Sequence, residues 1–426
     1  MDEYEALLRR IYPLHRGPLK EWDLTRMERF CTLLGNPQDA FWTVHVTGSN
    51  GKGSLASSIA VALWTEGKGA SSFGLFTSPH LHSFRERIVV DGKPISRQEV
   101  CHYLPPLLEI AEHHRLGLSF FEIVCGLAFC YFAARGVEGA VLEVGCGGRL
   151  DATNVVHRTR LCLITSISFE HVPLLGSTLE EIATEKAAIA KPGSYLLLGP
   201  TVPRAPVEKK ALELSVALEQ IGSTGDWEQE NGLLLDRALD LLDIRSAEAQ
   251  AAAKSYRAPC RGELMAATGQ RPPIYLDVAH NEAALAAMCR RLMRQLPNDN
   301  HYQLLFGLSE GRQIQQCARP LIDCASCWRL LPTSHPRLIP PSCLREGLLE
   351  MGVDAQMISL PASCHEALQS AFTQVEPIVI CGSFFFMAEM RHCLGLGESS
   401  CPLEANEQYQ LAGHRSSCTT SAACRL

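Results

Sequence analysis

The sequence predicts an α/β protein: a P-loop-type ATPase domain built on a mostly parallel sheet, followed by a smaller Rossmann-like α/β domain. Three observations predict this class. The chain has 426 residues, which is more than one hydrophobic core usually holds. Short apolar segments of strand length alternate with helical patterns along most of the chain. A glycine-rich turn containing a lysine lies between the first of these segments and a helix.

Seven segments have the length and composition of buried strands. In the first half of the chain these are residues 41–48, 139–148, 161–168 and 194–199. In the second half they are residues 273–281, 302–312 and 377–386. Buried strands that alternate with helices form parallel sheets covered on both faces, and ligands bind at the carboxyl ends of such strands.

The limits of the domains follow from changes in composition. An alanine-rich helical stretch ends in a turn near Pro259, so we assign residues 1–258 to the first domain and residues 259–397 to the second. Residues 398–426 are rich in serine, cysteine and other polar residues without periodicity. We expect them to form a disordered tail.

Composition limits the partners and the cellular location. The 39 basic and 46 acidic residues give a net charge of -7, which argues against a sequence-independent nucleic-acid partner. We expect no membrane partner and a cytoplasmic location, because no segment approaches 18 uninterrupted apolar residues and the N-terminal residues lack a secretory pattern. The 18 cysteines are scattered, so we expect reduced thiols. Cys324 and Cys327 form a lone CxxC pair, which makes a zinc site improbable.

The segment "TGSNGKGS" (47–54) has the pattern of a phosphate-binding loop. Its glycines allow backbone N–H groups to point at phosphate oxygens, the helix N-terminus adds positive potential, and the lysine adds a charge. The alternative is a plain glycine-rich turn between a strand and a helix. We expect the nucleotide phosphates to be bound by Asn50, Gly51, Lys52, Gly53 and Ser54.

One position of this loop departs from the usual pattern. Most such loops place a serine or threonine directly after the lysine to bind Mg²⁺, whereas this chain has Gly53 there and Ser54 one place later. Some metal ligands must therefore come from other segments, such as those that carry Ser78, Glu143 and His171. A buried glutamate can equally pair with a lysine or arginine, and a lone histidine is often a core residue, so these residues alone leave each ligand open.

Taken in order, the motifs resemble the folylpolyglutamate synthase and dihydrofolate synthase family of the Mur-ligase superfamily, in particular its bifunctional bacterial members. The likeness extends over about residues 20–395. It includes "LGNPQ" (34–38), "HVTGSNGKGS" (45–54), "TSPHL" (77–81), "FFE" (120–122), "EVGCGGRLDATN" (143–154), "EKAAIAKPG" (185–193), "DVAHN" (277–281) and "CGSFFF" (381–386).

The resemblance implies an ATP-dependent ligase. ATP would convert a substrate carboxylate into an acyl phosphate, which the amine of L-glutamate would attack to give an amide, ADP and phosphate. The implied ligands are ATP, one or two Mg²⁺ ions, dihydropteroate, folates and L-glutamate, and we expect a monomer. The alternatives are a synthase that only extends folates, a cell-wall Mur ligase, and a nucleotide-binding module without catalysis.

The resemblance also implies roles for individual residues. The catalytic set is Lys52, Glu143, His171 and Lys186, the last as a carbamylated lysine. The magnesium ligands are Ser78, Glu143, His171 and carbamylated Lys186, to which we add Ser54. The nucleotide is also held by Arg261, Asp277 and His280. The pterin substrate lies near Asp23, Phe121, Leu150, Asp151 and Ala152, and His80 orients the substrates.

Some positions leave the family pattern or remain open. The linker reads "APCRGEL" where the family has Pro-Gly-Arg, so Cys260 must adopt the turn that glycine allows. The nucleotide segment has Val278 and Glu282 where glycine and proline are usual, and Glu170 stands where aspartate is common. The alternative role for Asp151 is to cap the turn that leads to Asn154.

Overall fold

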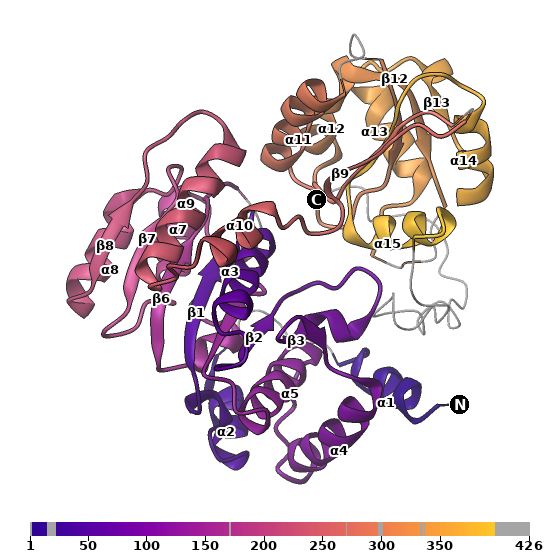
Figure 1. The fold of residues 1–426 in the computed structure, drawn as a ribbon. Coiled ribbons are helices and arrows are strands. Elements are labelled where there is room, and N and C mark those ends of the chain that lie inside the picture. The colour runs from indigo at the N-terminus through magenta and orange to yellow at the C-terminus, as the bar shows by residue number, and fades with distance from the viewer. Residues whose placement is uncertain are drawn as a thin grey trace.

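Two α/β lobes lie next to each other, and each is built on its own sheet (Figure 1). The computed structural model describes residues 2–14, 23–169, 172–269, 271–296, 301–332, 335 and 337–396. In the first lobe eight strands follow the order β4-β3-β2-β5-β1-β6-β7-β8. In the second lobe six strands follow the order β13-β12-β11-β14-β10-β9. The predicted α/β class with two largely parallel sheets is confirmed.

The first sheet is parallel except at one edge, where β3 and β4 run antiparallel to their neighbours. Its strands are β1 (Trp42–Thr47), β2 (Phe73–Phe76), β3 (Ile88–Val90), β4 (Lys93–Pro94), β5 (Gly139–Glu143), β6 (Thr159–Ile164), β7 (Tyr195–Leu198) and β8 (Ala217–Gln220). The four segments predicted in this half correspond to β1, β5, β6 and β7. The other four strands were not predicted: β3 and β4 are very short and β8 ends in polar residues, whereas β2 is an apolar segment that was not recognised as a strand.

Helices cover both faces of the first sheet because successive strand residues point to opposite sides. Val141 packs on one side with α3 (Lys52–Glu66), α9 (Trp227–Leu241) and α10 (Ala247–Ser255). Leu142 packs on the other side, in the core formed with α1 (Glu3–Ile11), α2 (Thr25–Leu33), α4 (Arg97–His113) and α5 (Phe120–Ala134). On the same side of the sheet, β6 and β7 pack against α7 (Leu179–Ala187) and α8 (Arg204–Leu214). The short helix α6 (Val172–Leu175) lies between β6 and α7 in the chain.

The second sheet has five parallel strands and the antiparallel edge strand β9. They are β9 (Arg261–Met265), β10 (Ile274–Asp277), β11 (Tyr302–Phe306), β12 (Ala325–Leu330), β13 (Ile358–Ser359) and β14 (Ile378–Cys381). One face packs against α11 (Glu282–Gln295), α12 (Ile314–Ala318) and α13 (Pro341–Glu350), and the other against α14 (Cys364–Phe372) and α15 (Phe384–Cys393).

The chain passes between the lobes after α10. Cys260 lies in this connection with a φ of 56°, in the left-handed region, so the prediction that it takes over the conformation of a glycine is confirmed. Its thiol is free, like every cysteine in the described part of the chain. A boundary at 258/259 stays a prediction, and the proposed tail (398–426) lies outside the described residues. Within the described ranges, no helix is long and apolar enough to cross a bilayer.

A loop of the first lobe is anchored in the second lobe. Leu81 is buried in the apolar core that α14 and α15 form against the second sheet. Beside it, the Arg391 Nε atom donates a hydrogen bond to His82 Nε2 over 2.8 Å. The backbone N–H groups of Leu81, His82 and Ser83 all donate to the Glu86 carboxylate, at 2.7 to 2.8 Å, so this loop is stiff.

His45, in the middle of β1, should make folding sensitive to acid. It is fully buried, its Nε2 atom lies 2.8 Å from Thr153 Oγ1, and burial lowers its pKa from 6.5 to about 3. Below pH 6.5 the unfolded chain therefore binds a proton that the folded chain does not, and stability falls as the pH falls. In urea unfolding, His45→Gln should reduce this slope by about 1.4 kcal/mol per pH unit between about pH 4 and 6. Equal slopes in both proteins would contradict this assignment.

Candidate active site

The phosphate loop connects β1 to α3 at the carboxyl edge of the first sheet. Gly51 caps α3 with a φ of 86°, and α3 begins at Lys52. The Lys52 Nζ atom donates to the carbonyl oxygens of Gly48 at 2.7 Å and Ser49 at 3.3 Å. The lysine thus lies folded along its own loop, with its charge at the loop opening, as a phosphate-binding lysine requires.

Residues after β6 hold the loop in place, and sequence reasoning did not identify them. The Thr165 hydroxyl donates to the Asn50 carbonyl over 2.6 Å, and the Asn50 N–H donates to the Ser166 hydroxyl over 3.0 Å. A Cβ atom on Gly48 would lie 2.0 Å from Thr165 Oγ1, so only glycine fits there. β6 pairs with β1, so these contacts depend on the sheet rather than on nearby sequence.

Glu143 explains why a glycine follows the lysine. It ends β5 with 5% of its surface exposed, and its Oε2 atom accepts a hydrogen bond from the Ser78 N–H over 2.9 Å. A Cβ atom on Gly53 would lie 3.2 Å from both carboxylate oxygens of Glu143. The carboxylate therefore occupies the space next to the position that carries the metal-binding hydroxyl in other phosphate loops.

The charge of Glu143 has no direct counterion within the described part of the chain. Burial raises the pKa of this carboxyl above its usual value, although Lys52, Arg261 and Arg87 attract its charged form. A divalent cation would supply the missing positive charge, and Glu143 and Ser78 lie where they would hold it. His171, the third predicted ligand, lies outside the described residues. Among the described residues, this site included, no three His, Cys, Asp or Glu side chains form a metal-binding group.

Gly53→Ser should weaken metal binding, because the new side chain competes with the Glu143 carboxylate for space. We expect the Mg²⁺ concentration for half-maximal ADP formation to rise about tenfold. Shortening the carboxylate in Gly53→Ser/Glu143→Asp should recover part of this loss. Gly222→Ser is the control, since a Cβ atom at Gly222 meets nothing within 4 Å. An unchanged magnesium titration for Gly53→Ser would show that the carboxylate does not need this space.

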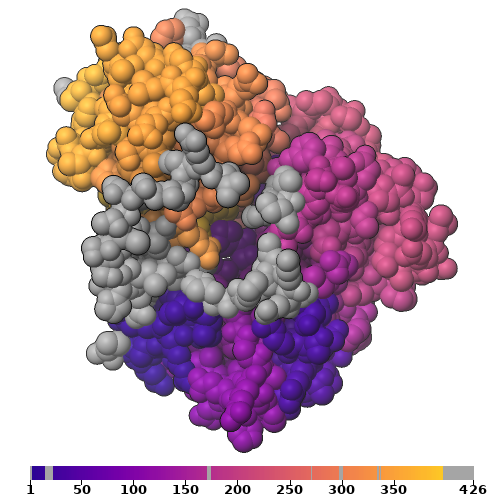
Figure 2. Space-filling model, turned by 180° about the vertical axis from the view of Figure 1, so that it is seen from behind, coloured from indigo at the N-terminus to yellow at the C-terminus, as the bar shows by residue number. Residues whose placement is uncertain are grey.

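A cavity of about 600 Å³ lies between the two lobes at the phosphate loop. Figure 2 shows the recess between the orange-to-yellow lobe and the indigo-to-magenta lobe. The first lobe lines the cavity with residues 49–53, Ser78, Pro79, Glu143, residues 145–147 and Lys186. The second lobe lines it with Arg261, His280, residues 309–312, Arg337 and residues 383–385.

Three predicted nucleotide-binding residues lie close together at the start of the second lobe. Arg261 pairs with Asp277 across β9 and β10, and the Arg261 guanidinium lies over the Phe384 ring, 5.0 Å from its centre. Burial raises the pKa of Asp277 and lowers that of His280 to about 4. His280 is therefore neutral at pH 7, and its Nδ1–H donates to the Val278 carbonyl over 2.8 Å, which leaves Nε2 as an acceptor.

Lys186, on α7, reaches the same loop as Lys52. Only 1% of its surface is exposed, and its Nζ atom donates to the Gly48 carbonyl over 3.0 Å. The Lys52 Nζ atom donates to the same oxygen. Two nominally cationic groups therefore converge on one carbonyl oxygen.

The predicted pterin-binding residues do not line this cavity, although Phe121 and Asp151 lie directly behind its wall at Gly145 and Cys146. Asp151 caps the 3₁₀ turn that follows it: its carboxylate accepts hydrogen bonds from Cys146 N–H at 3.0 Å and from Thr153 N–H and Oγ1 at 3.0 and 2.5 Å. This is the capping role considered as an alternative. The Ala152 side chain is buried in the core, so only its backbone is available to a ligand.

The remaining substrate candidates differ in their surroundings. Phe121 packs on Phe76, and a Cβ atom on Gly145 would lie 2.5 Å from its ring. His80 is buried, and its Nδ1 atom accepts a hydrogen bond from Arg87 Nε over 2.8 Å. The Asp23 carboxylate accepts a hydrogen bond from the Thr25 N–H over 2.9 Å, just before α2, and Leu150 is partly exposed in the turn before Asp151.

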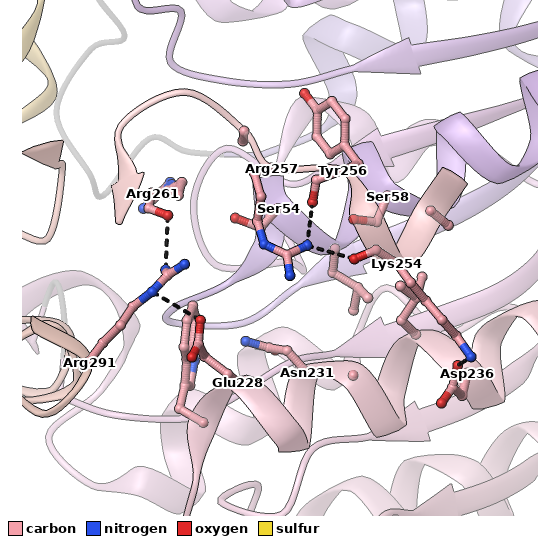
Figure 3. Close-up of a pocket in the computed structure, with 16 residues that line it drawn as sticks. Ser54, Ser58, Glu228, Asn231, Asp236, Lys254, Tyr256, Arg257, Arg261 and Arg291 are labelled. Carbon is pink, nitrogen blue, oxygen red and sulfur yellow. Dashed lines mark hydrogen bonds and ion pairs between the residues drawn. The ribbon is translucent and has the colours of Figure 1, made fainter. Parts of the chain in front are cut away.

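A second pocket of about 270 Å³ lies beside the phosphate loop (Figure 3). It is lined by Ser54 and Ser58 of α3, Trp227 and Asn231 of α9, Tyr256, Arg257, and both Arg261 and Arg291 of the second lobe. Ser54 therefore faces this pocket, and it does not line the cavity that contains Glu143 and Ser78. Sequence reasoning missed this pocket, because its walls come from segments far apart in the chain.

The fold and the site define a class of protein: an enzyme that binds a nucleotide through a phosphate loop, in a cleft between two α/β lobes. The dihydrofolate synthase/folylpolyglutamate synthase of Bacillus subtilis (strain 168) is 30% identical over an alignment of 424 positions, which covers 86% of this chain and 94% of that protein. This chain belongs to the dihydrofolate synthase/folylpolyglutamate synthase family and is a ligase, as its motifs predicted.

Solved structures agree with this assignment. Mycobacterium tuberculosis folylpolyglutamate synthase, complexed with ADP and AMPPCP, has 25% identity and a TM-score of 0.81, over 92% of this chain and 99% of that one. A bifunctional folylpolyglutamate synthase/dihydrofolate synthase with Mn, AMPPNP and L-glutamate bound has the same identity and TM-score, over 93% and 99%. No family model matches the sequence.

Proposed function

We propose that this enzyme joins L-glutamate to dihydropteroate and also to the γ-carboxyl of tetrahydrofolate glutamates, with release of ADP and phosphate. The observation that carries the proposal is the cavity between the lobes, where Lys52 and Glu143 face Arg261 and His280. The name of the Bacillus subtilis relative includes both activities. Free cysteines throughout the described residues support a reducing, cytoplasmic location.

The reaction has two steps. A carboxylate oxygen of the pterin substrate attacks the γ-phosphorus of ATP, and the bond to the β,γ-bridging oxygen breaks to release ADP. The amine of L-glutamate then attacks the acyl carbon, phosphate leaves, and the amine loses a proton. Lys52 and the loop N–H groups hold the phosphates in line and stabilise the charge on the transferred group. Glu143 and Ser78 would hold Mg²⁺, which supplies further positive charge when bound.

The second lobe supplies a site for L-glutamate. Arg312 and Arg337 line the cavity opposite the phosphate loop, and guanidinium groups bind carboxylates in pairs of hydrogen bonds. Ser309 and Ser383 line it as well, with their hydroxyl oxygens 2.8 Å apart. We assign the two carboxylates of L-glutamate to this group.

The pocket in Figure 3 is a site for the nucleoside of ATP. It adjoins the phosphate loop, and the Asn231 Oδ1 atom would lie 3.3 Å from a Cβ atom on Gly51, the residue that caps α3. Trp227 and Tyr256 offer aromatic surface for the base, and the Asn231 amide offers both a donor and an acceptor. Arg261 lines both pockets and would contact the phosphates between them.

Lys186 is proposed to carry a carbamate, formed from its neutral amine and CO₂ with release of a proton. Two ammonium groups that share the Gly48 carbonyl repel each other, and the modification removes one positive charge beside the metal site. With ¹³C-labelled bicarbonate, NMR should show a carbamate carbon in the wild type and in Lys209→Ala, an exposed control, but not in Lys186→Ala. A short carboxylic acid should restore part of the activity of Lys186→Ala. The same spectrum in all three proteins would refute the modification.

The test of function is ADP release in the presence of ATP, Mg²⁺ and L-glutamate. We expect activity with dihydropteroate and with tetrahydrofolate. Activity with tetrahydrofolate alone would limit the enzyme to extending folates. Activity only with a nucleotide-sugar peptide would assign it to cell-wall synthesis instead, and nucleotide binding without turnover of any acceptor would refute catalysis.

A further inference from the structure

The two lobes meet through a pair of asparagine side chains. Asn281 Nδ2 donates to Asn50 Oδ1 over 2.9 Å, and Asn50 Nδ2 donates to Asn281 Oδ1 over 3.4 Å. Asn50 belongs to the phosphate loop, whereas Asn281 precedes α11 in the second lobe and has 5% of its surface exposed. This pair is a direct polar link between the nucleotide-binding segments of the two lobes.

Each partner is held by its own lobe. Asn281 is the N-cap of α11, and its Oδ1 atom accepts a hydrogen bond from the Ala284 N–H over 2.9 Å. This bond fixes the orientation of the amide, because its oxygen must face the helix and its NH₂ group must then face Asn50. On the other side, Thr165 and Ser166 hold the backbone of Asn50. The asparagine pair therefore joins the N-terminus of α11 to the phosphate loop, and each is held in place by its own lobe.

The position of Asn281 connects this link to the proposed ligands. Asp277 and His280 directly precede it, and Arg261 is the strand neighbour of Asp277. Farther along α11, Arg291 and Arg294 form ion pairs with the Glu228 side chain at the start of α9. α11 thus contacts the first lobe at two places, at the phosphate loop through its N-cap Asn281 and at Glu228 through its last turns.

We propose that Asn281 is a positioning residue for the bound nucleotide. Its amide pair with Asn50 sets the distance between the phosphate loop and residues 277–280, so that Arg261, Asp277 and His280 reach the nucleotide that the loop holds. The inference rests on the proposed function for the identity of that nucleotide. A small change in this distance should weaken nucleotide binding, because the three side chains contact the nucleotide only when they are correctly placed.

The test distinguishes the contact between Asn281 and Asn50 from the role of Asn281 as the N-cap of α11. Asn281→Ser keeps a capping oxygen but is too short to reach Asn50, so thermal stability should change little. We expect the Kd for AMPPNP with Mg²⁺, measured by calorimetry, to rise about tenfold, together with the KM for ATP.

Ser363→Ala is the matched control, because it removes a helix cap that does not line the cavity. Ser363 is the N-cap of α14, and its hydroxyl accepts a hydrogen bond from the Glu366 N–H over 3.1 Å. This substitution should lower stability and leave the Kd for AMPPNP unchanged.

A double-mutant cycle completes the test and does not depend on how well Asn281→Ser folds. Asn50→Ala removes the same pair from the other lobe without affecting a helix cap. If the pair acts as one unit, Asn50→Ala/Asn281→Ser should bind AMPPNP no more weakly than the weaker single variant. Wild-type affinity in Asn281→Ser, or a double loss equal to the product of the single losses, would overturn the proposal. If this pattern holds while dihydropteroate gives no ADP, the proposed function fails and the positioning role stands.

Discussion

Replacement of Lys52 by alanine should lower kcat for ADP formation at least about a thousandfold, with the largest effect on phosphoryl transfer. The Lys52 Nζ atom is held at the loop opening by the carbonyl oxygens of Gly48 and Ser49, so little reorganisation is needed before it meets a phosphate. A cation in this position stabilises the transferring group more than the bound ATP, and its loss therefore affects kcat as well as binding.

The control for this experiment lies just beyond the other end of the same helix. Lys68 follows α3, and its side chain is exposed. Lys68→Ala removes the same charge without touching the loop and should keep wild-type kcat. Both variants should unfold within a few degrees of the wild type. A Lys52→Ala enzyme with near wild-type kcat would show that the loop does not bind the reacting phosphates.

Replacement of Glu143 by glutamine should raise the Mg²⁺ concentration for half-maximal activity by about a hundredfold. Glutamine has the same shape and keeps an oxygen that accepts the Ser78 N–H, so the loop should stay in place. It loses the negative charge that a hard cation requires, and this charge is buried without an ion-pair partner among the described residues. Chelation of divalent metal should abolish ADP formation by the wild type.

Glu138→Gln provides the matched control for the glutamate. Glu138 is exposed, and it precedes β5 at the opposite end from Glu143. Its variant should show the wild-type magnesium titration. An unchanged titration for Glu143→Gln as well would show that Glu143 is not a metal ligand.

The sequence predicted those parts of the fold whose signals are local. The phosphate loop is a continuous motif, and β5, β10 and β14 are largely apolar runs. β12 was missed because Ser326 and Arg329 interrupt its apolar pattern, although the Arg329 side chain is buried and its Nη1 atom lies 2.8 Å from the Cys327 sulfur. In the CxxC pattern, Cys324 ends a 3₁₀ helix and Cys327 lies in the strand that follows it.

The parts of the site that escaped prediction are built from distant segments. Thr165 reaches Asn50 only because β6 lies beside β1, and Asn281 reaches it only because the two lobes are in contact. Gly53 illustrates the same limit. The sequence showed that a hydroxyl was missing after Lys52, but the nearby carboxylate of Glu143 became evident only from the geometry.

The anchoring of Leu81 affects how the enzyme releases its products. This side chain lies in the core of the second lobe, three residues after Ser78, and the Glu86 carboxylate stiffens the segment between Leu81 and Ser83. If product release requires the lobes to separate, either Leu81 leaves that core, at a cost of about 1.5 to 3 kcal/mol, or the loop moves with the second lobe and draws Ser78 away from Glu143. In the second case, the movement that opens an exit for ADP would also separate the two proposed ligands of Mg²⁺, so each turnover would end with a loosened ion and begin with its recapture.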